Sequence, residues 1–239
     1  MNKVLVVAAH PDDEVLGCGG AIARHIQEGD KVYVLILAEG ITSRDAIRNK
    51  KKRTIELQKL SNSTKKSHKI LGATSVKTFD LPDNRMDSVD LLDVVKIIEK
   101  EIKKINPRII YTHHIGDLNI DHYITHRAVM TACRPEPKRS VKKIFCFEIP
   151  SSTEWQSVTS KNYFKPNCFV DISKTLTKKI KALKAYEEVI NSFHFFKALY
   201  HYANLLDQKG QKDEAINQMK SLIGSSKDLP DYKLEKERY

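Results

Sequence analysis

The sequence contains few cysteines, and they are widely separated. The four, Cys18, Cys133, Cys146 and Cys168, include no C-x-x-C pair. This spacing indicates neither a zinc knuckle nor a disulfide framework, so we expect buried, reduced thiols. The chain also lacks an apolar run long enough for a membrane span, and its amino terminus lacks the charged segment and apolar stretch of a signal peptide. These absences predict a cytoplasmic protein without a membrane span.

A phosphate-binding loop is also missing. Gly17, Gly19 and Gly20 stand close together, but neither a Walker lysine nor the full dinucleotide-binding spacing accompanies them. We therefore expect these glycines to allow close helix packing.

The charge is unbalanced, with 41 Lys and Arg residues against 30 Asp and Glu and a formal net charge of +11. The one dense basic patch, residues 50–53, falls in a predicted basic helix over 45–71. No nucleic-acid-binding motif accompanies it, so a solvated helix face explains the patch and we expect no nucleic-acid partner. A nucleic-acid-binding role for this helix is one alternative. A basic surface would also attract a phosphorylated or nucleotide-linked small molecule.

Strand-like and helix-like segments alternate along most of the 239 residues. Strands are predicted at 4–9, 31–40, 75–83, 108–114, 142–149 and 168–173, and helices at 21–29, 45–71, 91–105, within 115–135 and at 173–189. This alternation is typical of an α/β protein with a mostly parallel sheet and helices on both faces.

The composition changes near residue 190. The stretch "KALYHYANLLDQKGQKDEAINQMKSL" resembles a single tetratricopeptide unit, which predicts a helical hairpin within 195–223. We expect one domain over 1–190, followed by this hairpin and a basic tail over 191–239. The hairpin either packs on its own domain or binds a protein partner or a second copy of the chain, because such repeats need neighbours to bury their faces.

Two clusters of ionisable residues follow predicted strands. "VVAAHPDDEVLG" (6–17) runs from a buried strand into acidic residues, and "THHIGDLNIDHYITH" (112–126) follows the fourth strand. Both clusters are expected at the carboxyl ends of parallel strands, where α/β proteins bind ligands. His10, Asp13 and His122 would form the three-ligand set of a catalytic zinc site with one position for water. Iron also suits such a set.

Neighbouring polar residues are candidates for supporting roles. Asp12 need not bind the metal and would take a proton from the attacking water. Glu14 and Asp121 would orient ligands, Asp121 by holding a histidine in its tautomer. His126 is expected to pack rather than bind metal. Arg85 would pair with a phosphate or sugar oxygen, or form an ion pair with Asp83 or Asp87.

Together, "AHPDDE" and "GDLNIDH" resemble the PIG-L (LmbE-like) de-N-acetylases. "LPDNRMDS", "FEIPSSTEW" and "PNCFVDIS" extend the resemblance over about residues 3–190. The resemblance implies a Rossmann-like fold and zinc-dependent hydrolysis of the acetamide of an N-acetylglucosamine-type sugar to an amine and acetate. It also implies that His10, Asp13 and His122 bind the metal and that Asp12 is the general base.

The sequence departs from the family pattern at two places. Many members have a histidine where this chain has Asn119, and that histidine stabilises the tetrahedral intermediate and is a candidate proton donor to the leaving amine. Asn119 can donate a hydrogen bond to an oxyanion but cannot supply a proton in the same way. Proton return would then fall to Asp12, His113 or His114, and the sequence does not choose among them.

The second departure is the carboxyl end, where "NSFHFFKALYHYA" replaces the family's usual segment. This difference affects the expected substrate more than the expected reaction. A weakened catalyst that acts as an interaction module through its hairpin is therefore the alternative function.

Overall fold

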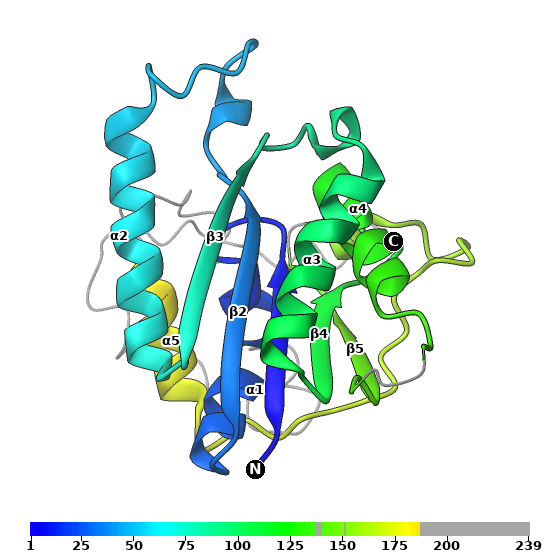
Figure 1. Cartoon of the computed structure of the whole chain (residues 1–239). Coiled ribbons are helices and arrows are strands. Elements are labelled where there is room, and N and C mark those ends of the chain that lie inside the picture. Colours follow the sequence, from blue (N-terminus) through cyan, green and yellow to red (C-terminus); the bar gives the residue numbers. More distant parts are fainter. Residues whose placement is uncertain (137–139, 151, 187–239) are drawn as a thin grey trace, which may run out of the picture. The chain divides into compact units, whose positions relative to one another are not determined.

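The computed structural model describes residues 1–136, 140–150 and 152–186 (Figure 1). Five parallel strands form one sheet in the order β3-β2-β1-β4-β5. Their bounds are β1 Lys3–Ala8, β2 Lys31–Ala38, β3 Ser75–Leu81, β4 Ile109–His113 and β5 Lys143–Phe147. The predicted α/β fold is confirmed.

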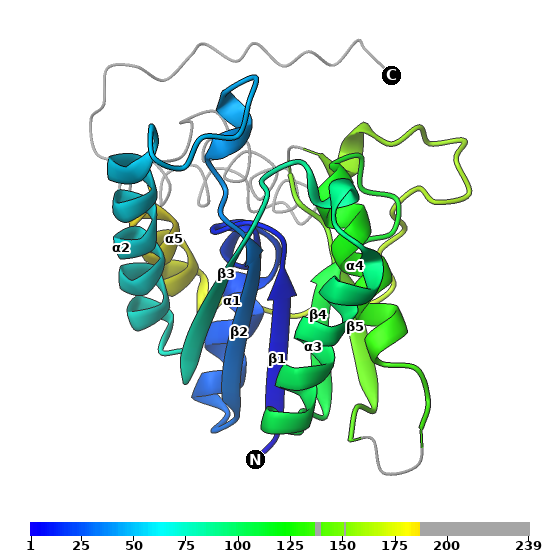
Figure 2. The same ribbon diagram turned by 45° about the horizontal axis from the view of Figure 1, so that its top comes forward.

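Helices cover both faces of the sheet. They are α1 Asp13–Gln27, α2 Thr54–Leu71, α3 Leu91–Ile105, α4 Ile120–Ala132 and α5 Leu176–Lys184, with short 3₁₀ turns at Thr42–Arg44, Met86–Ser88 and Thr153–Trp155. Helices α3 and α4 pack together on one face, and α5 packs against α1 and α2 on the other (Figures 1 and 2). Strand β1, in the middle, is therefore buried from Val4 to Ala8, as its unbroken apolar run predicts.

The strand order sets the position of a ligand site. From β1 the chain proceeds to β2 and β3 on one side, and then crosses to β4 and β5 on the other side. This reversal makes the gap beyond the carboxyl ends of β1 and β4 a topological switch point, where open α/β sheets bind their ligands.

Two glycines of α1 lie where a side chain would not fit. A Cβ atom on Gly17 would lie 2.3 Å from a ring carbon of Phe147, and one on Gly20 would lie 2.6 Å from Cδ1 of Ile172. The prediction of close helix packing is therefore confirmed at both positions.

Three predicted elements are wrong. The helix predicted over 21–29 begins at Asp13, because Gly17, Gly19 and Gly20 lie inside it instead of before it. The basic helix begins at Thr54 instead of residue 45, because Lys52 and Arg53 turn back to form ion pairs with Asp45. The segment 168–173 forms no strand: Phe169 is 80% exposed, while Ile172 packs on Gly20. This segment is instead an irregular connection that runs along the protein surface from the sheet to α5.

The cysteines match the prediction in part. All four are free, but only Cys18 is buried, and Cys168 is exposed. No helix in the described part of the chain is long and apolar enough to cross a membrane. The predicted hairpin at 195–223, and the domain boundary at residue 190, lie outside the described residues.

Candidate active site

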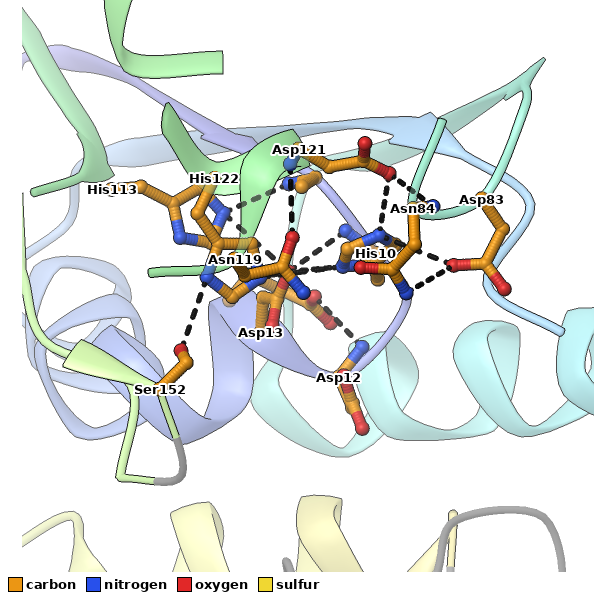
Figure 3. A network of polar contacts seen from close by, with 12 residues as sticks. His10, Asp12, Asp13, Asp83, Asn84, His113, Asn119, Asp121, His122 and Ser152 are labelled. Carbon is orange, nitrogen blue, oxygen red and sulfur yellow. Dashed lines mark hydrogen bonds and ion pairs between the residues drawn. The ribbon is translucent and has the colours of Figure 1, made fainter. Parts of the chain in front are cut away.

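The two predicted clusters meet at the switch point. His10 follows β1, Asp13 begins α1, and His122 lies in the first turn of α4. All three are buried side chains, no more than 9% exposed, and they converge beyond the ends of β1 and β4 (Figure 3).

Three ligand-type atoms form a nearly equilateral triangle. Nδ1 of His10 lies 3.3 Å from Oδ2 of Asp13 and 3.3 Å from Nε2 of His122, and that Nε2 lies 3.1 Å from the same Asp13 oxygen. Tetrahedral zinc with bonds of about 2.0–2.1 Å separates its ligand atoms by roughly 3.3–3.4 Å. The triangle thus has the size of one face of a zinc coordination tetrahedron.

A carboxylate holds the outer nitrogen of each of these histidines. Nε2 of His10 lies 2.9 Å from Oδ2 of Asp121, and Nδ1 of His122 lies 3.0 Å from Oδ2 of Asp117. Such a carboxylate fixes the tautomer of a histidine and leaves its other nitrogen as an acceptor. Both inner nitrogens are therefore prepared to bind a cation.

Two further groups of His and Asp residues overlap this one among the described residues: His113, Asp117 and His122, and His10, Asp83 and Asp121. Both use a carboxylate that supports a histidine. Asp121 is also committed elsewhere, because it accepts backbone N–H bonds from Asn84 at 2.7 Å and from Met86 at 2.9 Å. In the group of His10, Asp13 and His122, by contrast, the three ligand-type atoms that face one another are not the atoms used by the supporting carboxylates.

The protonation of the cluster reflects its dense charge. Burial raises the pKa of Asp13, but the charges of His122 and His113 outweigh it and lower the pKa well below its usual range. Burial lowers the pKa of His122, whereas Asp13 and Asp117 raise it to about 9. Likewise, Asp121 and Asp13 overcome burial and raise the pKa of His10.

Asp12 lies beside the triangle without contacting its three atoms (Figure 3). It occupies the N-cap position of α1, but its carboxylate accepts no capping hydrogen bond, and its φ is 114°. A positive φ is strained for a residue with a Cβ. Burial, followed by the charges of Asp13 and Glu14, raises the pKa of Asp12 well above its ordinary value.

The two histidines at the end of β4 point to different places. His113 is fully buried, and its Nε2 accepts the backbone N–H of Ala9 at 2.9 Å. Burial lowers its pKa well below the usual range. His114 instead donates from Nε2 to the carbonyl of Asn162 at 2.8 Å. Only His113 therefore belongs to the cluster.

Asn119 is the N-cap residue of α4. Its Oδ1 accepts the backbone N–H of Asp121 at 2.9 Å, and its own N–H donates to Asp117 at 2.9 Å. This cap uses the oxygen of the amide, and the NH₂ group makes no hydrogen bond within the described residues.

Glu14 and Arg85 have contacts that differ from those expected, whereas His126 packs as expected. Glu14 touches none of the triangle atoms and accepts the backbone N–H of Asp12 at 3.1 Å. Within the described residues, Arg85 forms no ion pair with Asp83 or Asp87; Nη2 donates to the carbonyls of residues 45 and 46. His126 donates to the carbonyl of His113 at 2.9 Å, as a packing residue would.

The family described as GlcNAc-PI de-N-acetylase (PIG-L) matches residues 5–133, more than half of the chain. The chain belongs to the PIG-L family. The matched residues include most of β1 and all of α1, β4 and α4, so both clusters of the site lie within the PIG-L match.

Among curated proteins, the PIG-L chain is 29% identical over 190 residues to the uncharacterized deacetylase YaiS of Escherichia coli, covering 77% of this chain and 90% of YaiS. It is 27% identical over 198 residues to diacetylchitobiose deacetylase of Thermococcus kodakarensis, covering 78% and 70%. The crystal structure of GalB, the 4-carboxy-2-hydroxymuconate hydratase of Pseudomonas putida, superposes with a TM-score of 0.66 at 22% identity, covering 95% and 91%. This last likeness concerns the fold alone.

Asp117 and its partners are functional residues of this PIG-L chain that are not among those predicted from the sequence. Asp117 accepts hydrogen bonds from Thr153 at 2.6 Å and from Ser152 at 2.9 Å, besides contacting His122. Asp117 lies within the "GDLNIDH" motif, five positions before the candidate ligand His122. An acidic residue so close to a candidate ligand was the one sign in the sequence that Asp117 could support it. The sequence gives no sign that the loop after β5 reaches Asp117.

Proposed function

We propose that this PIG-L protein is a metal-dependent deacetylase that hydrolyses the acetamide of an N-acetylglucosamine-type sugar or its conjugate. His10, Asp13 and His122 would bind the metal, zinc or iron. The observation that carries the proposal is the zinc-sized triangle of their atoms, with a separate buried carboxylate, Asp12, beside it. A metal ion at this triangle would polarise the amide carbonyl and make water more acidic.

Asp12 is the general base in this proposal. Its carboxylate is spared from helix capping, and its raised pKa suits a group that accepts a proton near neutral pH. Asp12 would also return the proton to the leaving amine. His113 and His114 are poor donors for this step. Nε2 of His113 accepts the N–H of Ala9 and so carries no proton, and burial lowers the pKa of this ring, whereas His114 donates from Nε2 to the carbonyl of Asn162.

Asn119 would stabilise the oxyanion with its amide NH₂ group. We predict that Asn119→Ser lowers kcat by about 10²-fold, because serine keeps an oxygen that can cap α4 but lacks the amide NH₂ group, and its shorter side chain cannot place its hydroxyl proton where that group lies. Steady-state kinetics beside thermal unfolding tests this prediction. An unchanged kcat in a variant of normal stability would remove Asn119 from the reaction.

Asp117 would strengthen metal binding through His122. We predict that Asp117→Asn weakens zinc affinity by roughly 10- to 100-fold, because an amide cannot support the histidine as a carboxylate does. A competition titration with a zinc chelator measures the change. Asp87→Asn, a change of the same kind outside the cluster, is the control and should leave the affinity unchanged.

The direct test of the function is acetate release from N-acetylglucosamine and from diacetylchitobiose by zinc-loaded and iron-loaded protein. We expect release with at least one of them, lost on treatment with chelator and restored by metal. Hydration of 4-carboxy-2-hydroxymuconate without any acetate release would replace the deacetylase proposal with a hydratase. Inactivity on every compound, in protein that holds metal, would favour the interaction module.

A further inference from the structure

The strained backbone at Asp12 has a specific support. An aspartate at an N-cap normally turns its carboxylate onto the first N–H groups of the helix. Asp12 does not, and its φ of 114° and ψ of −31° lie outside the regions that L-residues favour. Such a conformation is energetically unfavourable and persists only where surrounding contacts impose it.

Glu14 provides the contact at Asp12 itself. Oε2 of Glu14 accepts the backbone N–H of Asp12 at 3.1 Å. In an ordinary N-cap, the side chain of the N-cap residue accepts an N–H of the helix. Here a side chain inside the helix accepts the N–H of the N-cap residue, as in a capping box. This bond fixes the peptide plane before Asp12 while leaving the Asp12 carboxylate uncommitted.

Glu14 is in turn held by a hydrogen bond from the segment after α5, and a histidine of α2 lies beside it. The hydroxyl of Tyr186, just after α5, donates to Oε1 of Glu14 at 3.1 Å. Nε2 of His68, on α2, lies 3.5 Å from the same oxygen, and Nδ1 of His68 donates to the carbonyl of Thr64. Glu14 and Tyr186 are fully buried, and His68 is 3% exposed. The carboxylate therefore has one oxygen for Asp12 and one for Tyr186.

We propose that Glu14 and Tyr186 are positioning residues that hold Asp12 in its catalytic conformation. The proposal rests on Asp12 being the general base. Tyr186 belongs to the segment that follows the sheet and lies outside the 5–133 match. Tyr186 is thus distant in the sequence from the metal-site motifs. It nevertheless supports Asp12, because it hydrogen-bonds the buried Glu14 carboxylate that accepts the Asp12 N–H.

Tyr186→Phe tests the proposal because it removes one hydroxyl and keeps the ring. We expect kcat for acetate release from diacetylchitobiose to fall about tenfold, with KM within twofold and metal content unchanged, since a displaced base slows the reaction without loosening the substrate. Thr175→Val is the matched control. It also removes a buried hydroxyl bond from the α5 segment to α1, but to the carbonyl of Gly20 instead of Glu14. Equal kcat values in the two variants, or a loss of metal in Tyr186→Phe, would overturn the proposal.

Crystal structures provide a readout that does not depend on activity. In Glu14→Ala, we expect Asp12 to relax to a negative φ, because its N–H loses its acceptor. Glu14→Gln keeps an oxygen for that N–H and should restore the positive φ and recover activity relative to Glu14→Ala. A positive φ retained in Glu14→Ala would refute the positioning role. If the wild-type protein releases no acetate, the proposed function fails, and these structures, with that of Tyr186→Phe, still decide whether Glu14 and Tyr186 hold Asp12.

Discussion

Replacement of Asp12 by alanine is expected to lower kcat by about 10³- to 10⁴-fold while the protein keeps its metal. General acid–base catalysis typically raises a rate by about 10²- to 10⁴-fold, and we expect the upper part of this range because Asp12 would both accept and return the proton. Asp12 does not contact the three atoms of the triangle (Figure 3), so its loss should leave the metal in place. Metal analysis and steady-state kinetics on the same preparation measure both effects.

The adjacent aspartate is the control. Asp13→Ala removes an oxygen that lies within 3.3 Å of both histidine nitrogens of the triangle, so we expect it to lose metal and activity together. Two neighbouring aspartates would then give opposite results for metal content. Asp12→Asn keeps the side-chain volume and should be as impaired as Asp12→Ala. Near-normal turnover in either Asp12 variant would contradict its role as the base.

The convergence of the two clusters could be predicted from the sequence because it depends on topology. Parallel strands place their carboxyl ends at one edge of the sheet, and an unbroken apolar run such as that of β1 identifies a central strand. His10 and His122, 112 positions apart, therefore meet once β1 and β4 are neighbours. The resemblance to a known family added the roles of the residues to this geometry.

Contacts that depend on loops could not be predicted in the same way. Asp117 accepts hydrogen bonds from the hydroxyls of Ser152 and Thr153, and Arg85 donates hydrogen bonds to backbone carbonyls near residue 45. No periodicity in a sequence records where a loop folds back. The start of α2 could not be predicted for a related reason. In the sequence, the charges of Lys52 and Arg53 are typical of an exposed helix face, but in the structure both residues form ion pairs with the preceding Asp45.

Replacement of His122 by alanine is expected to reduce the metal content from about one ion per chain to nearly none and to abolish acetate release. His122 supplies the atom that joins the two segments, since Nε2 lies 3.3 Å from the His10 nitrogen and 3.1 Å from the Asp13 oxygen. A three-ligand site that loses one protein ligand binds its ion far more weakly. Elemental analysis of protein purified after zinc or iron supplementation is the measurement.

His126→Gln separates loss of a ligand from damage to α4. His126 lies one helical turn after His122 and bonds to the carbonyl of His113, so glutamine keeps a donor at this position, and the variant should retain its metal. If His122→Ala still holds about one ion per chain, the ion lies elsewhere and the triangle is not the metal site. If neither wild type nor variant binds metal after supplementation, the hydrolase proposal falls, because Asp12 would then have no activated water to deprotonate.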